Sequence, residues 1–202
     1  VGEGQCNRWV DQPGLKGVLL DGRKSQPLAE GEGQWCLALP DNLEDVEVMR
    51  CSRWDPTGDG AELWQSFAAQ GRIPNSNNDR ASRAGEQASA ALAVKVSLDP
   101  GQCLEIPIVI SWDLPVTAFA TGVSDWRRYT DFHGRKGTAA TAIAAEALRD
   151  WRSWRDQIDR WQEPVLARTE LPEPLRMALF NELYDLASGG SCLLYTSDAA
   201  DD

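Results

Sequence analysis

The spacing of hydrophobic residues changes once along this chain, and that change limits the fold more than any other feature. Up to about residue 114, apolar side chains recur at every second position within short runs, as in β-strands with one buried face. From residue 138 they recur every three or four positions, which is the period of an amphipathic helix. Strands followed by helices predict two domains, a sheet domain first and a helical region after it.

Three short runs are predicted to be strands, because Gly, Pro, Asp and Asn separate them. They lie at Leu15–Asp21, Gln34–Leu39 and 46–51. In the second run Trp35, Leu37 and Leu39 alternate with Gln34, Cys36 and Ala38. This alternation predicts that the larger apolar residues form the buried face of that strand.

The clearest predicted unit is a β-hairpin. Its first strand has an apolar residue at every second position, at Leu92, Val94, Val96 and Leu98. Its return strand repeats the pattern with Leu104, Ile106, Ile108, Ile110, Trp112 and Leu114. Residues 99–102, DPGQ, suit a tight turn, since proline presets φ at its second position and glycine accepts a positive φ at its third. Pro107 cannot donate a ladder hydrogen bond, so the return strand is predicted at a sheet edge or with a bulge. A hairpin with one apolar face needs a second layer, which predicts a β-sandwich.

Residues 55–60, DPTGDG, precede a short predicted helix that ends at Gly71. Asp59 and Glu62 have the spacing of a capping box, with Asp59 in the capping position. The loop also resembles the start of a calcium loop, but the twelfth position from Asp55, where an EF-hand needs Glu, is Ser66. We therefore expect a capping loop, and we expect residues 74–87 to form a long exposed loop.

Two helices are predicted in the last third of the chain. The first covers 138–161, ends at Pro164 and has the apolar stripe Ile143, Ala147, Trp151, Trp154, Ile158 and Trp161. The second covers 175–187, with the stripe Leu175, Leu179, Leu183 and Leu186.

Charge and cysteine content exclude several classes of function. The 202 residues include 31 Asp and Glu against 20 Lys and Arg, a net charge of -11, which disfavours nucleic-acid partners and anionic membrane surfaces. No apolar run approaches the ~20 residues that span a bilayer. The five cysteines form no C-x-x-C pair and His133 is the only histidine, so we expect neither a zinc site nor a His-dependent triad. Such thiols are typical of a reducing compartment, which favours the cytoplasm.

No catalytic, cofactor-binding or metal-ligating residue is predicted. The phosphate-binding loop, the dinucleotide fingerprint and the nucleophile elbow are all absent. Paired carboxylates cannot be found by spacing, because their partners face each other in space rather than in sequence. Some of the nine tryptophans could stack on sugars, but periodicity predicts core packing for Trp112, Trp151, Trp154 and Trp161. Trp54, Trp64 and Trp126 are less constrained.

The last residues, 192–202, read CLLYTSDAADD and resemble the in-frame translation of a sequencing adapter. We therefore expect this tail to be an artefact and the chain to be a fragment at both ends.

Five longer motifs occur in the chain, in this order: WDPTGDGAELW at 54–64, SWDLPV at 111–116, RYTDFHG at 128–134, WQEPVL at 161–166 and ALFNELY at 178–184. Together they resemble glycoside hydrolase family 116, the family of the non-lysosomal glucosylceramidase, also called bile-acid β-glucosidase. The resemblance covers about residues 15–191.

The resemblance implies an N-terminal β-sandwich joined by long helices to an (α/α)6 barrel. Residues 1–135 correspond to the later part of the sandwich, 136–170 to the connecting helix and linker, and 171–191 to the first barrel helix. The family hydrolyses β-glucosides with retention, using a glutamate nucleophile and an aspartate acid/base that lie further along the barrel. Glu182 belongs to a packing helix before those positions, so no catalytic residue carries over.

The expected function is therefore that of a fragment of a retaining β-glucosidase acting on β-glucosides, including glucosylceramide-like glycolipids. The fragment is expected to be inactive alone, to need no cofactor, and to have its own barrel domain as partner. The alternative is a non-enzymatic carbohydrate-binding or interaction module built on a β-sandwich. The leucine stripe of the second helix separates the two, because in a free module it has nothing to pack against.

Overall fold

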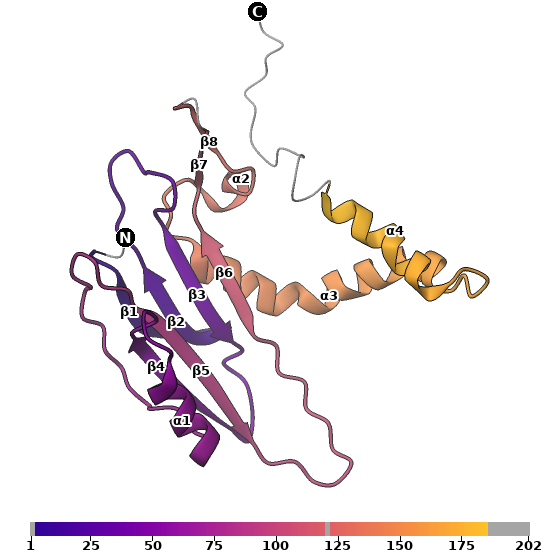
Figure 1. Cartoon of the computed structure of the whole chain (residues 1–202), viewed down its shortest axis with the longest axis horizontal. Coiled ribbons are helices and arrows are strands. Elements are labelled where there is room, and N and C mark those ends of the chain that lie inside the picture. The colour runs from indigo at the N-terminus through magenta and orange to yellow at the C-terminus, as the bar shows by residue number, and fades with distance from the viewer. Residues whose placement is uncertain (1–2, 120–121, 186–202) are drawn as a thin grey trace, which may run out of the picture. The chain divides into compact units, whose positions relative to one another are not determined.

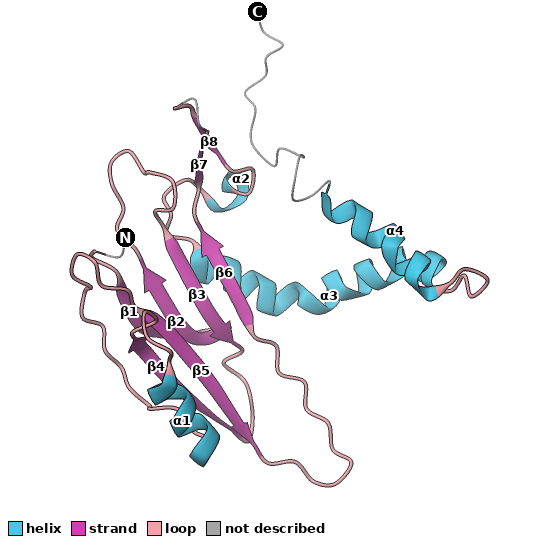
Figure 2. Cartoon of the chain, viewed as in Figure 1, coloured by secondary structure: helices cyan, strands magenta, loops and turns pink. Residues whose placement is uncertain are grey.

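The computed structural model describes residues 3–119 and 122–185 (Figure 1). The chain divides into two compact units, Val1–Leu148 and Arg149–Asp202. The first unit holds the described strands, and most of the helical residues follow them in sequence (Figure 2). The predicted order of strands first and helices afterwards is confirmed, apart from one short helix between two strands.

The strands of the first unit form antiparallel sheets. The largest sheet has four strands in the order β1 (Cys6–Gln12), β2 (Leu15–Asp21), β3 (Gln34–Leu39) and β6 (Val109–Asp113). Two further pairs are β4 (Val46–Trp54) with β5 (Ser89–Val96), and β7 (Val116–Ala118) with β8 (Ser124–Trp126). Strand β4 contacts β1, while β5 contacts β2 and β3, so the β4–β5 pair covers part of one face of the four-stranded sheet.

The three predicted short strands are present. The bounds of β2 and β3 are those expected from the sequence, and β4 runs three residues further, to Trp54. Strand β1 was not predicted, because its sequence CNRWVDQ has only two adjacent large apolar residues and shows no alternation. Its pairing with β2, from Cys6 opposite Asp21 to Gln12 opposite Leu15, makes it a strand in spite of that composition.

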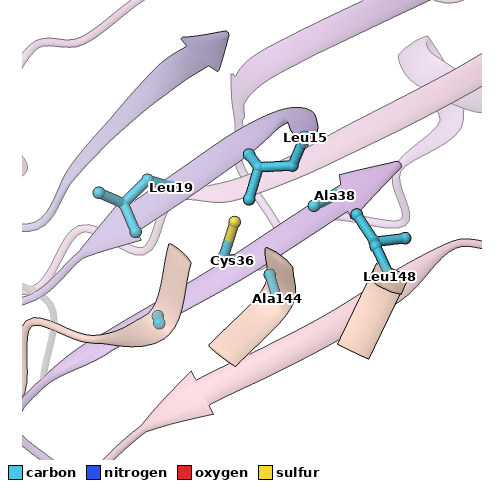
Figure 3. Close-up of a cluster of buried hydrophobic side chains, with 7 residues drawn as sticks. Leu15, Leu19, Cys36, Ala38, Ala144 and Leu148 are labelled. Atoms are coloured by element: carbon cyan, nitrogen blue, oxygen red, sulfur yellow. The ribbon is translucent and has the colours of Figure 1, made fainter. Parts of the chain in front are cut away.

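The core of the first unit lies between the four-stranded sheet and the start of helix α3 (Ala140–Leu166). Its buried members, drawn in Figure 3, are Leu15, Leu19, Cys36, Ala38, Ala140, Ala144 and Leu148. Small side chains on both surfaces let the helix approach the sheet closely, and close packing gives each buried atom more dispersion contacts.

This packing overturns the predicted orientation of β3 in part. Cys36 and Ala38 face the helix and are buried, whereas Trp35 lies on the opposite face and is exposed. On that opposite face Leu39 is buried as predicted, and Leu37 is half-buried. Hydrophobicity alone favoured the larger residues as the only buried set, but β3 has buried residues on both faces, and the small Cys36 and Ala38 lie against the helix. The predicted stripe of α3 is also displaced by one position, since its buried residues are Ala140, Ala144 and Leu148 rather than the set that begins at Ile143.

The predicted β-hairpin is wrong, although its turn is present. Gln102 donates its backbone N–H to the Asp99 carbonyl at 2.9 Å, as the DPGQ turn requires. Strand β5 nevertheless pairs with β4, and β6 pairs with β3, so the two expected partners belong to different sheets. Pro107 lies before β6, which is an edge strand of its sheet among the described residues. The apolar set that includes Ile108, Ile110 and Trp112 is exposed rather than buried.

Helix α1 (Ala61–Gln70) ends at Gly71 as predicted. Residues 74–87 contain no strand beyond a single bridge at Ser76 and are mostly exposed, which confirms the predicted loop. Helix α2 (Thr130–His133) is a single turn before α3.

The second unit contains the end of α3 and helix α4 (Glu173–Asp185). Helix α3 continues through Pro164 to Leu166, so the prediction that it ends at Pro164 is wrong. Trp161 makes an edge contact with Phe180 at 5.3 Å between ring centroids. Trp161 and Trp154 are nevertheless exposed, so the prediction that they are buried in a core is wrong.

Leu175 and Leu179 of the predicted stripe on α4 are exposed. The Leu183 side chain, Leu186 and the tail 192–202 lie outside the described residues. No helix among the described residues is both long enough and apolar enough to cross a membrane.

Candidate functional site

The loop between β4 and α1 carries two carboxylates and follows Trp54, the last residue of β4. Asp55 Oδ1 accepts hydrogen bonds from the Thr57 backbone N–H at 2.9 Å and from the Thr57 hydroxyl at 2.6 Å. These hydrogen bonds hold the pKa of Asp55 below its ordinary value. Asp59 Oδ1 accepts from the Ala61 N–H at 2.9 Å. One oxygen of each carboxylate is thus used to hold the loop in shape.

The predicted capping box is wrong in one respect. Gly60, not Asp59, occupies the N-cap of α1, with φ at 65° in the left-handed region that glycine enters without steric cost. Asp59 therefore stands one position earlier than a capping residue and bonds the first helical N–H. In the part of the chain that is described, no three His, Cys, Asp or Glu side chains gather in a way that could hold a metal ion.

Two hollows adjoin this loop, with volumes of about 350 and 410 Å³. Arg53, Trp54 and Asp55 line both of them. The indole Nε1 of Trp54 is buried and has no hydrogen-bond acceptor among the described residues. The indole ring of Trp54 lies against Gly60, where an added Cβ would stand 3.4 Å from the ring.

A charged cluster closes one side of the second hollow. Glu86 Oε2 pairs with Arg80 at 3.0 Å and Arg53 at 3.1 Å, and it accepts from the Arg83 N–H at 2.8 Å. The hydrogen bond from Arg80, followed by that from Arg83, lowers the pKa of Glu86 to about 2. A general acid that works near neutral pH needs a raised pKa instead, so Glu86 is a structural anion.

A second polar cluster joins β6 to the start of α3. Asp113 is fully buried and accepts two hydrogen bonds, from the Tyr129 hydroxyl at 2.7 Å and from the Ala139 N–H at 2.7 Å. Ser111, on the same face of β6, donates its hydroxyl to the Ala140 carbonyl at 2.7 Å. A carboxylate beside the first N–H groups of a helix also interacts favourably with the helix dipole. These contacts fix the position at which α3 leaves the sheet.

The surroundings of Tyr129 favour the protonated hydroxyl, which donates to Asp113. Burial raises the pKa of its hydroxyl, and the hydrogen bond to the Asp113 carboxylate raises it further. Gly33 is required beside this cluster, because a Cβ at that position would lie 1.9 Å from the Asp113 carbonyl oxygen.

The buried thiol of Cys36 does not form a nucleophilic site. Cys6, Cys36, Cys51 and Cys103 are free, and burial raises the pKa of Cys36 to about 11. A catalytic cysteine needs a lowered pKa and access to solvent, whereas Cys36 belongs to the core.

Both polar clusters lie within the range matched by a known family. Residues 2–154 match the family model of the N-terminal domain of glycosyl hydrolase family 116, described as beta-glucosidase 2. The chain belongs to glycosyl hydrolase family 116. The family 116 match includes all eight described strands and the first part of α3, and it confirms the resemblance to this family. Three of the five sequence motifs lie within the matched residues, and the motifs at 161–166 and 178–184 lie beyond them.

The family 116 motifs correspond to the two clusters. Motif 54–64 is the loop with the two hollows, and motifs 111–116 and 128–134 meet where Asp113 accepts from Tyr129. Sequence reasoning did not single out Asp113. The available signal was a polar residue in phase with Ser111 on a strand whose other face is apolar, which is unusual unless the polar residue has a buried partner. The side chain of Glu182, considered and rejected as catalytic, lies outside the described residues.

Proposed function

We propose that this chain is the non-catalytic N-terminal part of a retaining β-glucosidase. The observation that carries the proposal is the match of residues 2–154 to the N-terminal domain of family 116. In this proposal, residues 1–135 form the later part of a β-sandwich, 136–170 connect it to the catalytic domain, and 171–191 begin an (α/α)6 barrel. The nucleophile and the acid/base belong to that barrel, beyond the printed residues.

The five carboxylates with a shifted pKa support a non-catalytic role. A glycosidase needs one carboxyl group that stays protonated near neutral pH beside another that is ionised. The carboxylates Glu32, Asp55, Glu86, Asp150 and Glu170 all have lowered pKa values. Each is held in its ionised form by hydrogen bonds from its neighbours.

The substrates of the whole enzyme are β-glucosides, and the class we propose is glycolipids similar to glucosylceramide. The role of this part is mechanical. Ser111 and Asp113 hold the start of α3 against the sheet, which fixes the point at which the chain leaves the first unit.

The direct test is a glucosidase assay with the purified 202-residue chain and 4-nitrophenyl β-glucoside. The expected rate equals that of the buffer blank, while a polypeptide that includes the barrel hydrolyses the substrate with retention of the anomeric configuration. Hydrolysis by the 202-residue chain above the blank would overturn the assignment of a non-catalytic role.

A second candidate function, carbohydrate binding by the sheet unit itself, is favoured by the hollows beside Trp54. An indole N–H without an acceptor, beside carboxylate and guanidinium groups, has the chemistry that binds sugar hydroxyls. Calorimetric titration with glucose tests it. Trp54→Phe removes the N–H but keeps the ring, and should abolish any heat of binding. Trp64→Phe, at an exposed position on α1 that lines neither hollow, is the matched control.

A further inference from the structure

The two hollows beside Trp54 are parts of one cleft. Arg53, Trp54 and Asp55 line both hollows, so these three residues form the boundary that the hollows share. From this boundary the first hollow, of about 350 Å³, extends along the start of α1 to Ser76. The second hollow, of about 410 Å³, extends to the loop at 80–87. The cleft therefore runs between the loops at 55–61 and 74–87, and Trp54 lies where its two halves meet.

The charged groups that line the cleft nearly balance one another. They are the guanidinium groups of Arg53 and Arg80 and the carboxylates of Asp55, Asp59 and Glu86. Both guanidinium groups are already paired with Glu86. A strongly charged ligand of either sign therefore gains little here. A neutral ligand with many hydroxyl groups fits better, because each hydroxyl can donate to a carboxylate or accept from an N–H group.

Each half of the cleft has hydrogen-bonding groups to offer to such a ligand. Asp55 and Asp59 hold the loop through Oδ1, and Oδ2 of each has no donor among the described residues. Asp55 lines both hollows, and Asp59 lines the first. In the second hollow the exposed Gln87 has an amide that can both donate and accept. The two halves therefore resemble each other in chemistry, and they share the apolar surface of Trp54.

We propose that this cleft binds two consecutive sugar residues of a β-linked glucan, one in each hollow. The proposal rests on the second candidate function, carbohydrate binding by the sheet unit, and names its ligand class. Each hollow is near the lower limit of the ~300–1,000 Å³ of small-molecule pockets, so one hollow suits one sugar ring and the pair suits two. The β linkage is that of the substrates proposed for the whole enzyme.

The test is a calorimetric titration of the 202-residue chain with methyl β-glucoside, cellobiose and cellotriose, which contain one, two and three β-linked glucose rings. Cellobiose should bind with a Kd at least about tenfold lower than that of methyl β-glucoside, because its second ring gains contacts without a second loss of translational freedom. Cellotriose should bind about as tightly as cellobiose, since its third ring extends beyond the two hollows.

A substitution that fills one hollow makes the test specific to this cleft. Gly58 lines only the first hollow, and a Cβ added there meets no atom within 4 Å and needs no left-handed φ. Gly58→Phe should therefore fold, remove the advantage of cellobiose and leave the binding of methyl β-glucoside to the second hollow. Ala69→Phe, which adds the same side chain at an exposed position of α1 that lines neither hollow, is the matched control and should change nothing.

Two results would overturn the proposal and leave carbohydrate binding in place. One is an equal Kd for methyl β-glucoside and cellobiose, and the other is an advantage of cellobiose that survives Gly58→Phe. The absence of binding heat with all three sugars would overturn both the proposal and the second candidate function. The assignment to the N-terminal part of a β-glucosidase is tested separately, by the glucosidase assay.

Discussion

Replacing Asp113 with alanine is expected to lower the free energy of unfolding of the first unit by about 3–6 kcal/mol. The carboxylate is fully buried and accepts two hydrogen bonds of 2.7 Å, from the Tyr129 hydroxyl and the Ala139 N–H. A hydrogen bond to a charged group contributes about 1.5–3 kcal/mol, so two of them give the quoted range. Because domains are stable by only about 5–15 kcal/mol, a loss of this size removes a large part of the total.

Urea denaturation, followed by tryptophan fluorescence and by far-ultraviolet circular dichroism, measures this loss. Tyr129→Phe removes one of the two hydrogen bonds and should cost about 1.5–3 kcal/mol. In the double variant the two costs should not add, since both substitutions remove the same hydrogen bond. Asp11→Ala, at the exposed end of β1, is the control and should change stability by less than about 0.5 kcal/mol.

Two results would refute the reasoning about Asp113. A loss below about 1 kcal/mol for Asp113→Ala would mean that the buried hydrogen bonds contribute no more than surface ones. Full additivity of Asp113→Ala and Tyr129→Phe would mean that the two side chains do not interact.

Three further predictions concern the core, its thiol and the exposed loop. The pKa of Cys36 is raised from 9.0 to about 11, so the folded state holds the thiol proton more tightly. The contribution of Cys36 to the free energy of unfolding is fully present below about pH 9 and should fall by about 2–3 kcal/mol as pH rises to about 11. Urea titrations at pH 8 and 11 should show this loss, and the Cys36→Ala variant should not show it. Ala144→Leu should cost about 1–3 kcal/mol by overpacking the contact of α3 with the sheet, whereas Ala142→Leu, on the exposed side of the helix, should cost little; thermal melts of the two variants side by side test this. Glu86→Gln should speed tryptic cleavage after Arg80 several-fold, because the loop loses its central anion; an unchanged cleavage rate would show that Glu86 does not order the loop.

Local sequence patterns predicted the bounds of the strands better than they predicted which strands pair with each other. The bounds of β2 and β3 follow from turn residues and alternation, which are properties of a few neighbouring residues. The pairing of β5 with β4 depends on contacts between segments far apart in sequence. Both expected hairpin strands were apolar on one face, and that pattern does not state which other strand completes the sheet.

The sequence pattern predicted the wrong residues to be buried where the size and position of a side chain mattered more than its hydrophobicity. Ala38 and Ala144 are buried because the helix backbone comes close to the sheet, while Trp112 is too large for that side and lies exposed on the other. A sequence pattern ranks side chains by affinity for water, but it contains no information on the distance between the two surfaces that meet.

The sequence predicted where the candidate site lies, but not which side chains interact there. The sequence predicted that the loop at 55–60 leads into a helix, and it ruled out an EF-hand there. The role of Asp113 depends on Tyr129 and Ala139, which lie 16 and 26 positions away, and no spacing rule connects them.

The pairing of β3 with β6 has a consequence for the order in which the protein folds. Trp35 pairs with Trp112, so β4, α1 and β5 all lie in the chain between two neighbouring strands of one sheet. During synthesis the first three strands emerge early, but their sheet gains its fourth strand only after the whole inserted segment has been made. Contacts between such distant segments form slowly. Until β6 pairs with β3, the partly formed sheet therefore keeps its apolar surfaces exposed, which makes this chain a candidate for chaperone binding on the ribosome.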